Sequence, residues 1–266
     1  MSYLIKYKGQ KGHIPVVKQG DGGLNLISFD LLFFEQGMEY SEDTAGFEVC
    51  AVILGGKCTF ESGGERWENV GVREDVFGGP AAALYVPAGC SYKVIATDAA
   101  PVEVALLRCP AEASGGAAVY IPPEKVKIVE RGKDNWTRFV NDIVDKDIPA
   151  RSMLVGETFS PAGNWSSAPP HRHDVDDPPR ETNHEEVYFF KCKPEQGFQV
   201  IRLYTDDFSL NETYTVESND TVIITQGYHP VAAGPGYRGY YLWILAGKER
   251  TVCTHDDPRH VWLKNT

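Results

Sequence analysis

Residues 186–190 read EVYFF, a short apolar run that opens with a glutamate and follows a polar segment. Comparable runs, bounded by Gly, Pro or Asp and rich in β-branched and aromatic residues, occur at Glu48–Leu54, Ala82–Val86, Val102–Leu107, Phe198–Tyr204, Thr221–Thr225 and Tyr240–Ala246. Runs of this length and content are typical of strands. Only residues 134–144 (DNWTRFVNDIV) suggest a helix. The sequence therefore predicts an all-β protein, either a sandwich or a barrel.

An internal repeat predicts two copies of one β-barrel unit. Glu48-Val49 opens a strand in the first half, and Glu186-Val187 opens one in the second. A glycine follows a later strand in each half, 41 positions on (48 to 89, and 186 to 227). The apolar periodicity breaks at residues 111–125, which are rich in Gly and Pro. We therefore expect one domain over residues 1–118 and a second over residues 119–266.

Composition argues against several classes of partner. The 266 residues include 26 Lys and Arg but 37 Asp and Glu, which gives a net charge of −11. This balance disfavours nucleic acid and anionic membrane as partners. No apolar run approaches the roughly 20 residues that span a bilayer, and no signal peptide is evident. The six cysteines show no CxxC spacing and are expected to be reduced thiols in a cytoplasmic protein.

The second half contains a candidate metal site. His171 and His173 stand in an i, i+2 relation, so a strand would direct both side chains to the same face. Glu186 opens the next apolar strand, and His229 follows a glycine turn after another. Three imidazoles and one carboxylate suit one divalent transition metal, with Zn or Mn favoured and Fe or Ni as further options, rather than Ca or Mg.

Two assignments at this site stay open to alternatives. Glu185 competes with Glu186, because adjacent strand residues face opposite ways and only one can face the metal. Glu186 is preferred because it directly abuts the apolar run, and His184 is expected to be solvated at the end of an acidic insertion. The two halves can be aligned by subtracting 138 from the residue numbers of the second half. Glu186 then falls on Glu48, but the three histidines fall on Phe33, Glu35 and Ser91, which are not histidines. The first domain should therefore lack a metal and serve a structural or oligomeric role, which favours a homo-oligomer.

At these residues the sequence resembles a known family. The HxH pair, the strand-opening glutamate and the downstream histidine resemble the two motifs of the cupin superfamily. Longer segments resemble the 5-deoxyglucuronate isomerases of inositol catabolism: residues 163–174 (GNWSSAPPHRHD), 181–182 (ET), 185–188 (EEVY), 197–198 (GF), 202–205 (RLYT), 227–231 (GYHPV) and 256–258 (DDP).

This resemblance implies a bicupin with two jelly-roll barrels and a metal-dependent aldose–ketose isomerase activity. The family converts 5-deoxy-D-glucuronate, a uronate-type sugar acid, to 2-deoxy-5-keto-D-gluconate, and His171, His173, Glu186 and His229 would be the ligands by similarity. A metal-stabilised cis-enediolate is the expected intermediate. Two positions depart from the family pattern: residue 184 is His where an apolar residue is expected, and residue 243 is Trp where a polar residue is expected. Neither position is among these ligands.

A proton-transfer group and a cation for the substrate carboxylate must complete such a site. Candidates for the catalytic base are Glu185, Tyr188, Tyr228 and Tyr241. Arg202 is the first choice for the carboxylate, because a guanidinium binds a carboxylate through two parallel hydrogen bonds. Arg250 and Lys248 are the alternatives. The competing functions are a 5-keto-4-deoxyuronate isomerase of pectin breakdown, a cupin dioxygenase, and a non-enzymatic sugar-binding cupin.

Overall fold

The computed structural model describes residues 2–113 and 115–265, and it confirms the all-β prediction. Strands account for nearly all of the regular structure. The described helical segments are short 3-10 turns: η1 (Asp21–Gly23), η2 (Val76–Gly78), η3 (Pro123–Lys125), η4 (Asp134–Trp136) and η5 (Val261–Asn265). None of these is long and apolar enough to cross a membrane.

The first half folds as a large and a small antiparallel sheet facing each other. Six described strands form the large sheet, in the order β11 (Val119–Ile121), β8 (Ala83–Val86), β5 (Phe47–Gly55), β10 (Val102–Pro110), β3 (Ser28–Phe34) and β2 (Gly12–Val17). The small sheet has the order β4 (Glu39–Asp43), β9 (Ser91–Ala96), β6 (Cys58–Ser62) and β7 (Glu65–Val70). Apolar side chains from both sheets fill the space between them.

The second half repeats this arrangement. Its large sheet runs β1 (Leu4–Ile5), β20 (Thr221–Ile224), β17 (His184–Lys193), β22 (Arg238–Gly247), β14 (Met153–Ser160), β13 (Arg138–Val144) and β12 (Lys127–Arg131). The small sheet runs β15 (Trp165–Ser166), β21 (Val231–Ala233), β18 (Phe198–Tyr204) and β19 (Asn211–Glu217), and β16 (His171–Arg172) pairs separately with β23 (His255–Asp256). Its interior is aromatic as well as aliphatic.

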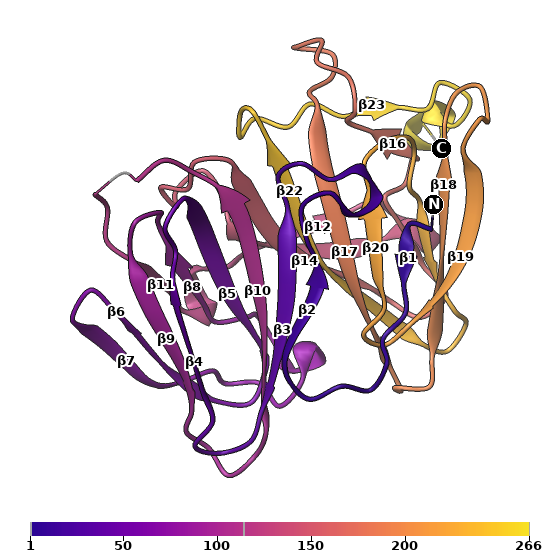
Figure 1. Cartoon of the computed structure of the whole chain (residues 1–266). Helices are drawn as coiled ribbons and strands as arrows, with labels where there is room; N and C mark the ends of the chain where they lie inside the picture. The colour runs from indigo at the N-terminus through magenta and orange to yellow at the C-terminus, as the bar shows by residue number, and fades with distance from the viewer. Residues whose placement is uncertain (1, 114, 266) are drawn as a thin grey trace.

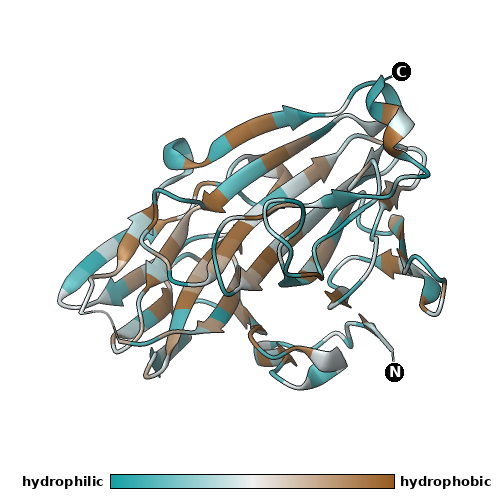
Figure 2. Ribbon diagram, turned by 90° about the horizontal axis from the view of Figure 1, so that it is seen from above, coloured by the Kyte–Doolittle hydropathy of each residue, from teal (hydrophilic) through white to brown (hydrophobic). Residues whose placement is uncertain are grey.

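The two large sheets pack against each other in the middle of the molecule (Figure 1). Alternation along each strand makes this possible, because every central strand has one face toward its own barrel and one toward the other half. In β17, Val187 and Phe189 join the cluster between the halves, whereas Tyr188 and Phe190 face the barrel interior. Figure 2 shows hydrophobic residues, in brown, recurring along many strands of the molecule. Both faces of the central strands in each large sheet are therefore buried.

Two glutamates hold the halves together in a reciprocal way. The Glu48 carboxylate, on β5, accepts hydrogen bonds from the backbone N–H groups of Arg151, Ser152 and Met153 at 2.6, 2.8 and 3.0 Å. The Glu185 carboxylate, on β17, accepts them from the N–H groups of Asn25 and Leu26 at 2.7 and 2.8 Å. Glu48 thus binds the segment that leads into β14 of the second half, and Glu185 binds the segment that leads into β3 of the first half.

This geometry corrects the repeat alignment. Val49 of β5 pairs with Val86, the last residue of β8, just as Glu186 of β17 pairs with Ile224, the last residue of β20. Val49 is therefore the counterpart of Glu186, and Glu48 is the counterpart of Glu185. The 41-residue spacing matched the correct strands and the correct glycines, since Gly89 and Gly227 each lie three residues after the end of the second strand. At the glutamates, however, it was displaced by one residue, and it therefore compared side chains on opposite faces of β5 and β17.

Strands at the edges cross the expected division at residue 118. β1, from the N-terminus, pairs with β20 of the second half, and β11, at residues 119–121, pairs with β8 of the first half. Figure 1 shows the indigo β1 strand lying among the strands of the second half. The first unit therefore extends to Ile121, and the second unit includes the beginning of the chain.

The helix suggested for residues 134–144 is wrong. Asp134–Trp136 forms a 3-10 turn, and Arg138–Val144 is strand β13, paired with β12 on one side and β14 on the other. Long-range pairing and the β-branched residues of the segment outweigh its helix-like pattern. Arg138 and Val140 consequently share one face of a sheet.

Candidate metal centre

The second barrel brings a compact group of potential ligands together. One ligand atom each from His173, Glu186 and His229 lies within 4.8 Å of the others, and all three residues are buried. The Glu186 Oε2 atom is 3.2 Å from the Nε2 atom of His173 and 3.4 Å from that of His229. These residues come from the end of β16, from β17 and from the turn after β20.

His171 lies beside this group. Its ring centroid is 4.9 Å from that of His229 and 6.4 Å from that of His173. The chain segment with His171 is held by pairing with Asp256 of β23. All four residues that the sequence pattern singles out therefore meet in the barrel, with His171 at the margin of the buried trio.

Backbone carbonyls orient all three imidazoles. The Nδ1–H groups of His173 and His229 donate to the carbonyls of His184 and Gly227, both at 3.0 Å, and that of His171 to Pro169 at 3.4 Å. Since a carbonyl oxygen can only accept, Nδ1 carries a proton in each ring, and the Nε2 atoms of His171 and His229 keep their lone pairs. The Nε2 atom of His173 instead donates to the Glu186 carboxylate at 3.2 Å. The buried His229 Nε2 has no hydrogen-bond donor among the described residues. Such orientation through the second nitrogen is what a metal-binding histidine requires.

The electrostatics suit a cation at the centre. Burial lowers the pKa of His171 and His229 to about 3, which keeps both rings neutral. Burial also opposes protonation of His173, but the hydrogen bond and charge of Glu186 raise the pKa of that ring. Two neutral imidazoles, the imidazole of His173 and one carboxylate form a donor set suited to a divalent transition metal. The residues therefore fit such an ion.

His184 is buried, contrary to the expectation that it is solvated. Its Nε2 atom bonds the Glu249 carbonyl at 2.8 Å, and its own carbonyl accepts the bond from His173. Gly247 faces it across the sheet, where a Cβ atom would lie 2.6 Å from the His184 ring. The glycine makes room for the imidazole, which supports the ligand next to it.

A hydroxyl cluster lies beside the metal group. The rings of Tyr188 and Tyr241 stack with centroids 4.3 Å apart, and the Ser167 Oγ atom lies 3.2 and 3.4 Å from their hydroxyls. The Tyr188 ring centroid is 5.9 Å from that of His229. Burial, followed by the Glu186 charge, raises the pKa of Tyr188 well above its usual value, so its phenol stays protonated.

The other two candidate bases lie elsewhere. Glu185 faces the junction of the halves, where its carboxylate is used by Asn25 and Leu26. The Tyr228 hydroxyl donates to Asp206 at 2.9 Å, and the Arg172 guanidinium lies 5.6 Å from its ring. Neither side chain joins the cluster around Tyr188.

The three cations suggested for a substrate carboxylate also lie away from the cluster. Arg202 faces outward from β18, since Ile201 and Leu203 point into the core, and it bonds the Asn211 Oδ1 atom at 2.8 Å. Arg250 donates to the backbone carbonyls of residues 145, 148, 150 and 153. Lys248 is exposed and lines a cavity at the junction of the halves.

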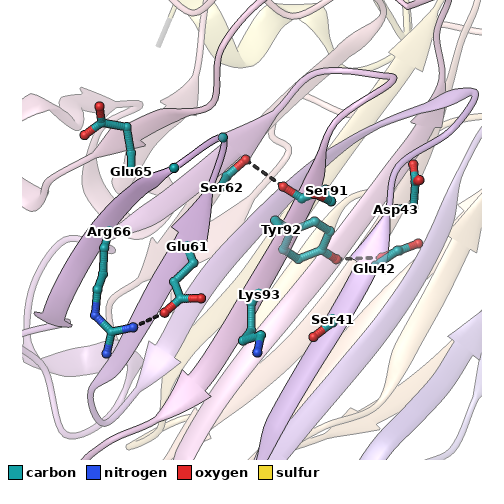
Figure 3. A pocket seen from close by; sticks show the side chains of 12 residues that line it. Ser41, Glu42, Asp43, Glu61, Ser62, Glu65, Arg66, Ser91, Tyr92 and Lys93 are labelled. Atoms are coloured by element: carbon teal, nitrogen blue, oxygen red, sulfur yellow. Dashed lines mark hydrogen bonds and ion pairs between the residues drawn. The ribbon is translucent and has the colours of Figure 1, made fainter.

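In the first barrel, Val49 stands at the position that Glu186 has in the second. Arg108, paired with Val49 in the sheet, forms ion pairs with Asp30 at 3.0 Å and Glu42 at 2.8 Å. Figure 3 shows the adjoining pocket on the small sheet, in which Tyr92 donates to Glu42. Its polar groups bond mainly to one another.

Comparison with known proteins gives consistent results over nearly the whole chain. A model of the KduI/IolB family matches residues 3–263. A 5-deoxy-glucuronate isomerase of Geobacillus kaustophilus is 43% identical over 96% of this chain and 91% of its own length. One of Bacillus subtilis subsp. natto is 38% identical over 99% of both chains.

Solved structures show the same architecture. An IolB-like protein from Salmonella typhimurium superimposes with a TM-score of 0.94 at 31% identity, covering 98% of both chains. The oxalate decarboxylase of Lactobacillus farciminis superimposes with a TM-score of 0.62 over 98% of this chain and 92% of its own. At 9% identity, that second likeness concerns the fold alone.

Proposed function

Because the chain belongs to the KduI/IolB family, we propose that it isomerises 5-deoxy-glucuronate, as its relatives' names state, at the His173–Glu186–His229 centre. The observation that carries this proposal is the set of inward-facing Nε2 atoms around a buried carboxylate. An aldose–ketose isomerisation moves one proton between adjacent carbons and another between their oxygens. It therefore needs an electrophile for the carbonyl and a proton-carrying group beside it.

His171, His173, Glu186 and His229 would hold one divalent metal ion, with Zn or Mn the favoured identities. When bound, the metal supplies Lewis acidity that polarises the sugar carbonyl and stabilises negative charge on its oxygen. His184 and Gly227 fix the orientation of two of these rings through their carbonyls.

Tyr188 would carry the proton that moves between the substrate oxygens. Its raised pKa keeps the phenol protonated, so it can donate to an oxygen on which negative charge develops. Ser167 and Tyr241 support it as hydrogen-bond and stacking partners. Burial of this cluster excludes bulk water and strengthens its hydrogen bonds to the substrate.

The proposal extends to the compartment, the small-molecule partner and the assembly of the protein. The cysteines of the described chain are all unpaired, in accord with a reducing cytoplasm. A sugar acid would be the small-molecule partner, and a homo-oligomer remains the expected assembly.

The test is a His171→Ala variant assayed without oxygen on 5-deoxy-glucuronate, together with its metal content by mass spectrometry. We expect loss of both metal and turnover, whereas His13→Gln, in the first half, should keep both. Full activity in the His171 variant would contradict the site. Turnover of the wild-type protein only in the presence of oxygen would instead indicate a dioxygenase.

A further inference from the structure

A sugar acid that is isomerised at its aldehyde end presents a carboxylate at the other end. Burying that charge near the metal centre requires a cation within reach, preferably a guanidinium. Several cations near the centre are already paired with acids. Arg172 bonds Glu181, Arg259 bonds Asp257, and Lys264 bonds Asp256.

Arg138 is differently placed. It lies on β13, on the same face as Val140, which pairs with Thr158 of β14. Thr158 in turn pairs with Tyr241 of β22. Strand register therefore points Arg138 into the second barrel, on the face that also carries Tyr241.

Arg138 lies near the hydroxyl cluster of Tyr188 and Tyr241. Its guanidinium interacts electrostatically with the hydroxyls of Tyr241 and Tyr188. The side chain thus lies on the hydroxyl-cluster side of the metal group.

Arg138 is held in place without an acidic partner. Its Nη1 atom lies 3.4 Å from the Trp136 carbonyl, and its guanidinium carbon lies 5.8 Å from the Trp136 ring centroid. Gly132 provides the space, since a Cβ atom there would lie 2.9 Å from Nη1. Within residues 2–113 and 115–265, no carboxylate lies within ion-pair distance of this guanidinium, so most of its five N–H donors remain available.

The turn that carries Trp136 is also fixed. The Asn164 side-chain amide donates to the carbonyls of Asp134 and Thr137 at 3.3 and 2.9 Å. This links the β12–β13 turn to the loop that leads to Ser167 and His171. A cation and the metal centre are thereby held in one arrangement before any ligand arrives.

Accepting the proposed function, we propose that Arg138 binds the carboxylate of the sugar-acid substrate while the aldehyde end lies at the metal centre. Arg138 would select acids over the corresponding neutral sugars. It replaces Arg202, Arg250 and Lys248 in this role, since those side chains are directed elsewhere.

The experiment removes the charge either from the protein, by substitution of Arg138, or from the substrate, by replacement of its carboxylate with an amide. Arg138→Gln and Arg138→Lys are compared with Arg202→Gln as a matched control, on 5-deoxy-glucuronate and on its uncharged amide. Loss of a charge-assisted, two-pronged contact should lower kcat/KM for the acid by about 10- to 100-fold in Arg138→Gln, mainly through KM. Arg138→Lys should recover part of this loss, and Arg202→Gln should change little.

The amide is the decisive readout. Wild-type protein should prefer the acid, and Arg138→Gln should lose that preference while keeping its metal content and melting temperature. Equal losses on acid and amide, or no loss on either, would overturn the role of Arg138.

Calorimetric binding of D-glucuronate and its amide separates this proposal from the proposed function. Wild-type protein that binds glucuronate through Arg138 but does not turn over 5-deoxy-glucuronate would contradict the isomerase alone. Wild-type protein that turns over the acid while Arg138→Gln binds glucuronate normally would contradict only the carboxylate contact.

Discussion

Tyr188 shows how strongly the position of one residue in a strand decides its chemistry. It stands two residues after Glu186, on the same face of β17, and therefore shares the barrel interior with the metal group. Val187, between them, points to the junction of the halves. A phenol in this position is dry, stacked on Tyr241 and unable to ionise at neutral pH.

Tyr188→Phe should leave metal content unchanged, because the ring still stacks on Tyr241 and no proposed ligand is lost. It should lower kcat by roughly 100-fold or more, the lower range for loss of a proton-transfer group. Steady-state kinetics of Tyr188→Phe and Tyr228→Phe check this, since the Tyr228 hydroxyl bonds Asp206 away from the cluster. An equal effect of both substitutions would argue against a role for Tyr188 in proton transfer.

Local patterns predict the residues of the centre better than they predict its surroundings. The HxH pair, the strand-opening glutamate and the histidine after a glycine turn are all local signals, and these four residues do meet in the barrel. Ser167 and Arg138 have no such signal. Ser167 follows β15, which pairs with the distant β21, and Arg138 faces the barrel through the pairing of β13 and β14 with the distant β22. A strand assignment for residues 138–144 would at least have put Arg138 and Val140 on one face.

At the scale of the element, a side chain of β22 lies directly over the backbone of β14. Gly156 pairs with Trp243, whose ring covers the glycine. A Cβ atom at residue 156 would overlap that ring and lie 2.6 Å from the Asn141 carbonyl oxygen. The indole can occupy the barrel wall only because residue 156 has no side chain.

Gly156→Ala should therefore destabilise the protein by about 1–3 kcal/mol through overpacking. Gly46→Ala is the matched control, because a Cβ atom there meets nothing within 4 Å. Its stability should stay within about 0.5 kcal/mol of the wild type. Urea denaturation measures both, and an unchanged midpoint for Gly156→Ala would show that Trp243 moves aside without cost.

At the scale of the molecule, the halves are joined by buried acceptors as well as by apolar packing. Glu48 is fully buried and also accepts from the hydroxyls of Tyr85 and Ser152, at 2.8 and 3.1 Å. Glu185 is only half-buried and serves Asn25 and Leu26. The repeat in the sequence predicts the duplication but not these contacts, because its alignment was displaced by one residue.

Glu48→Gln should cost roughly 3–5 kcal/mol of unfolding free energy, since a buried amide cannot accept every N–H that the carboxylate accepts. Glu185→Gln should cost about 1–3 kcal/mol, because water can replace part of its hydrogen bonding. Denaturation followed by circular dichroism compares the two. A larger loss for Glu185→Gln than for Glu48→Gln would contradict this ranking of the two contacts.

The pairing of β1 with β20 has a consequence for synthesis on the ribosome. Residues 12–121 contain every strand of the first barrel, so that barrel can close early in translation. Leu4 and Ile5, however, pair with Val222 and Thr221, which are made near the end of the chain. At about 5–20 residues per second, β20 is completed on the order of ten to forty seconds after β1. Leu4 and Ile5 are thus translated long before the residues with which they pair.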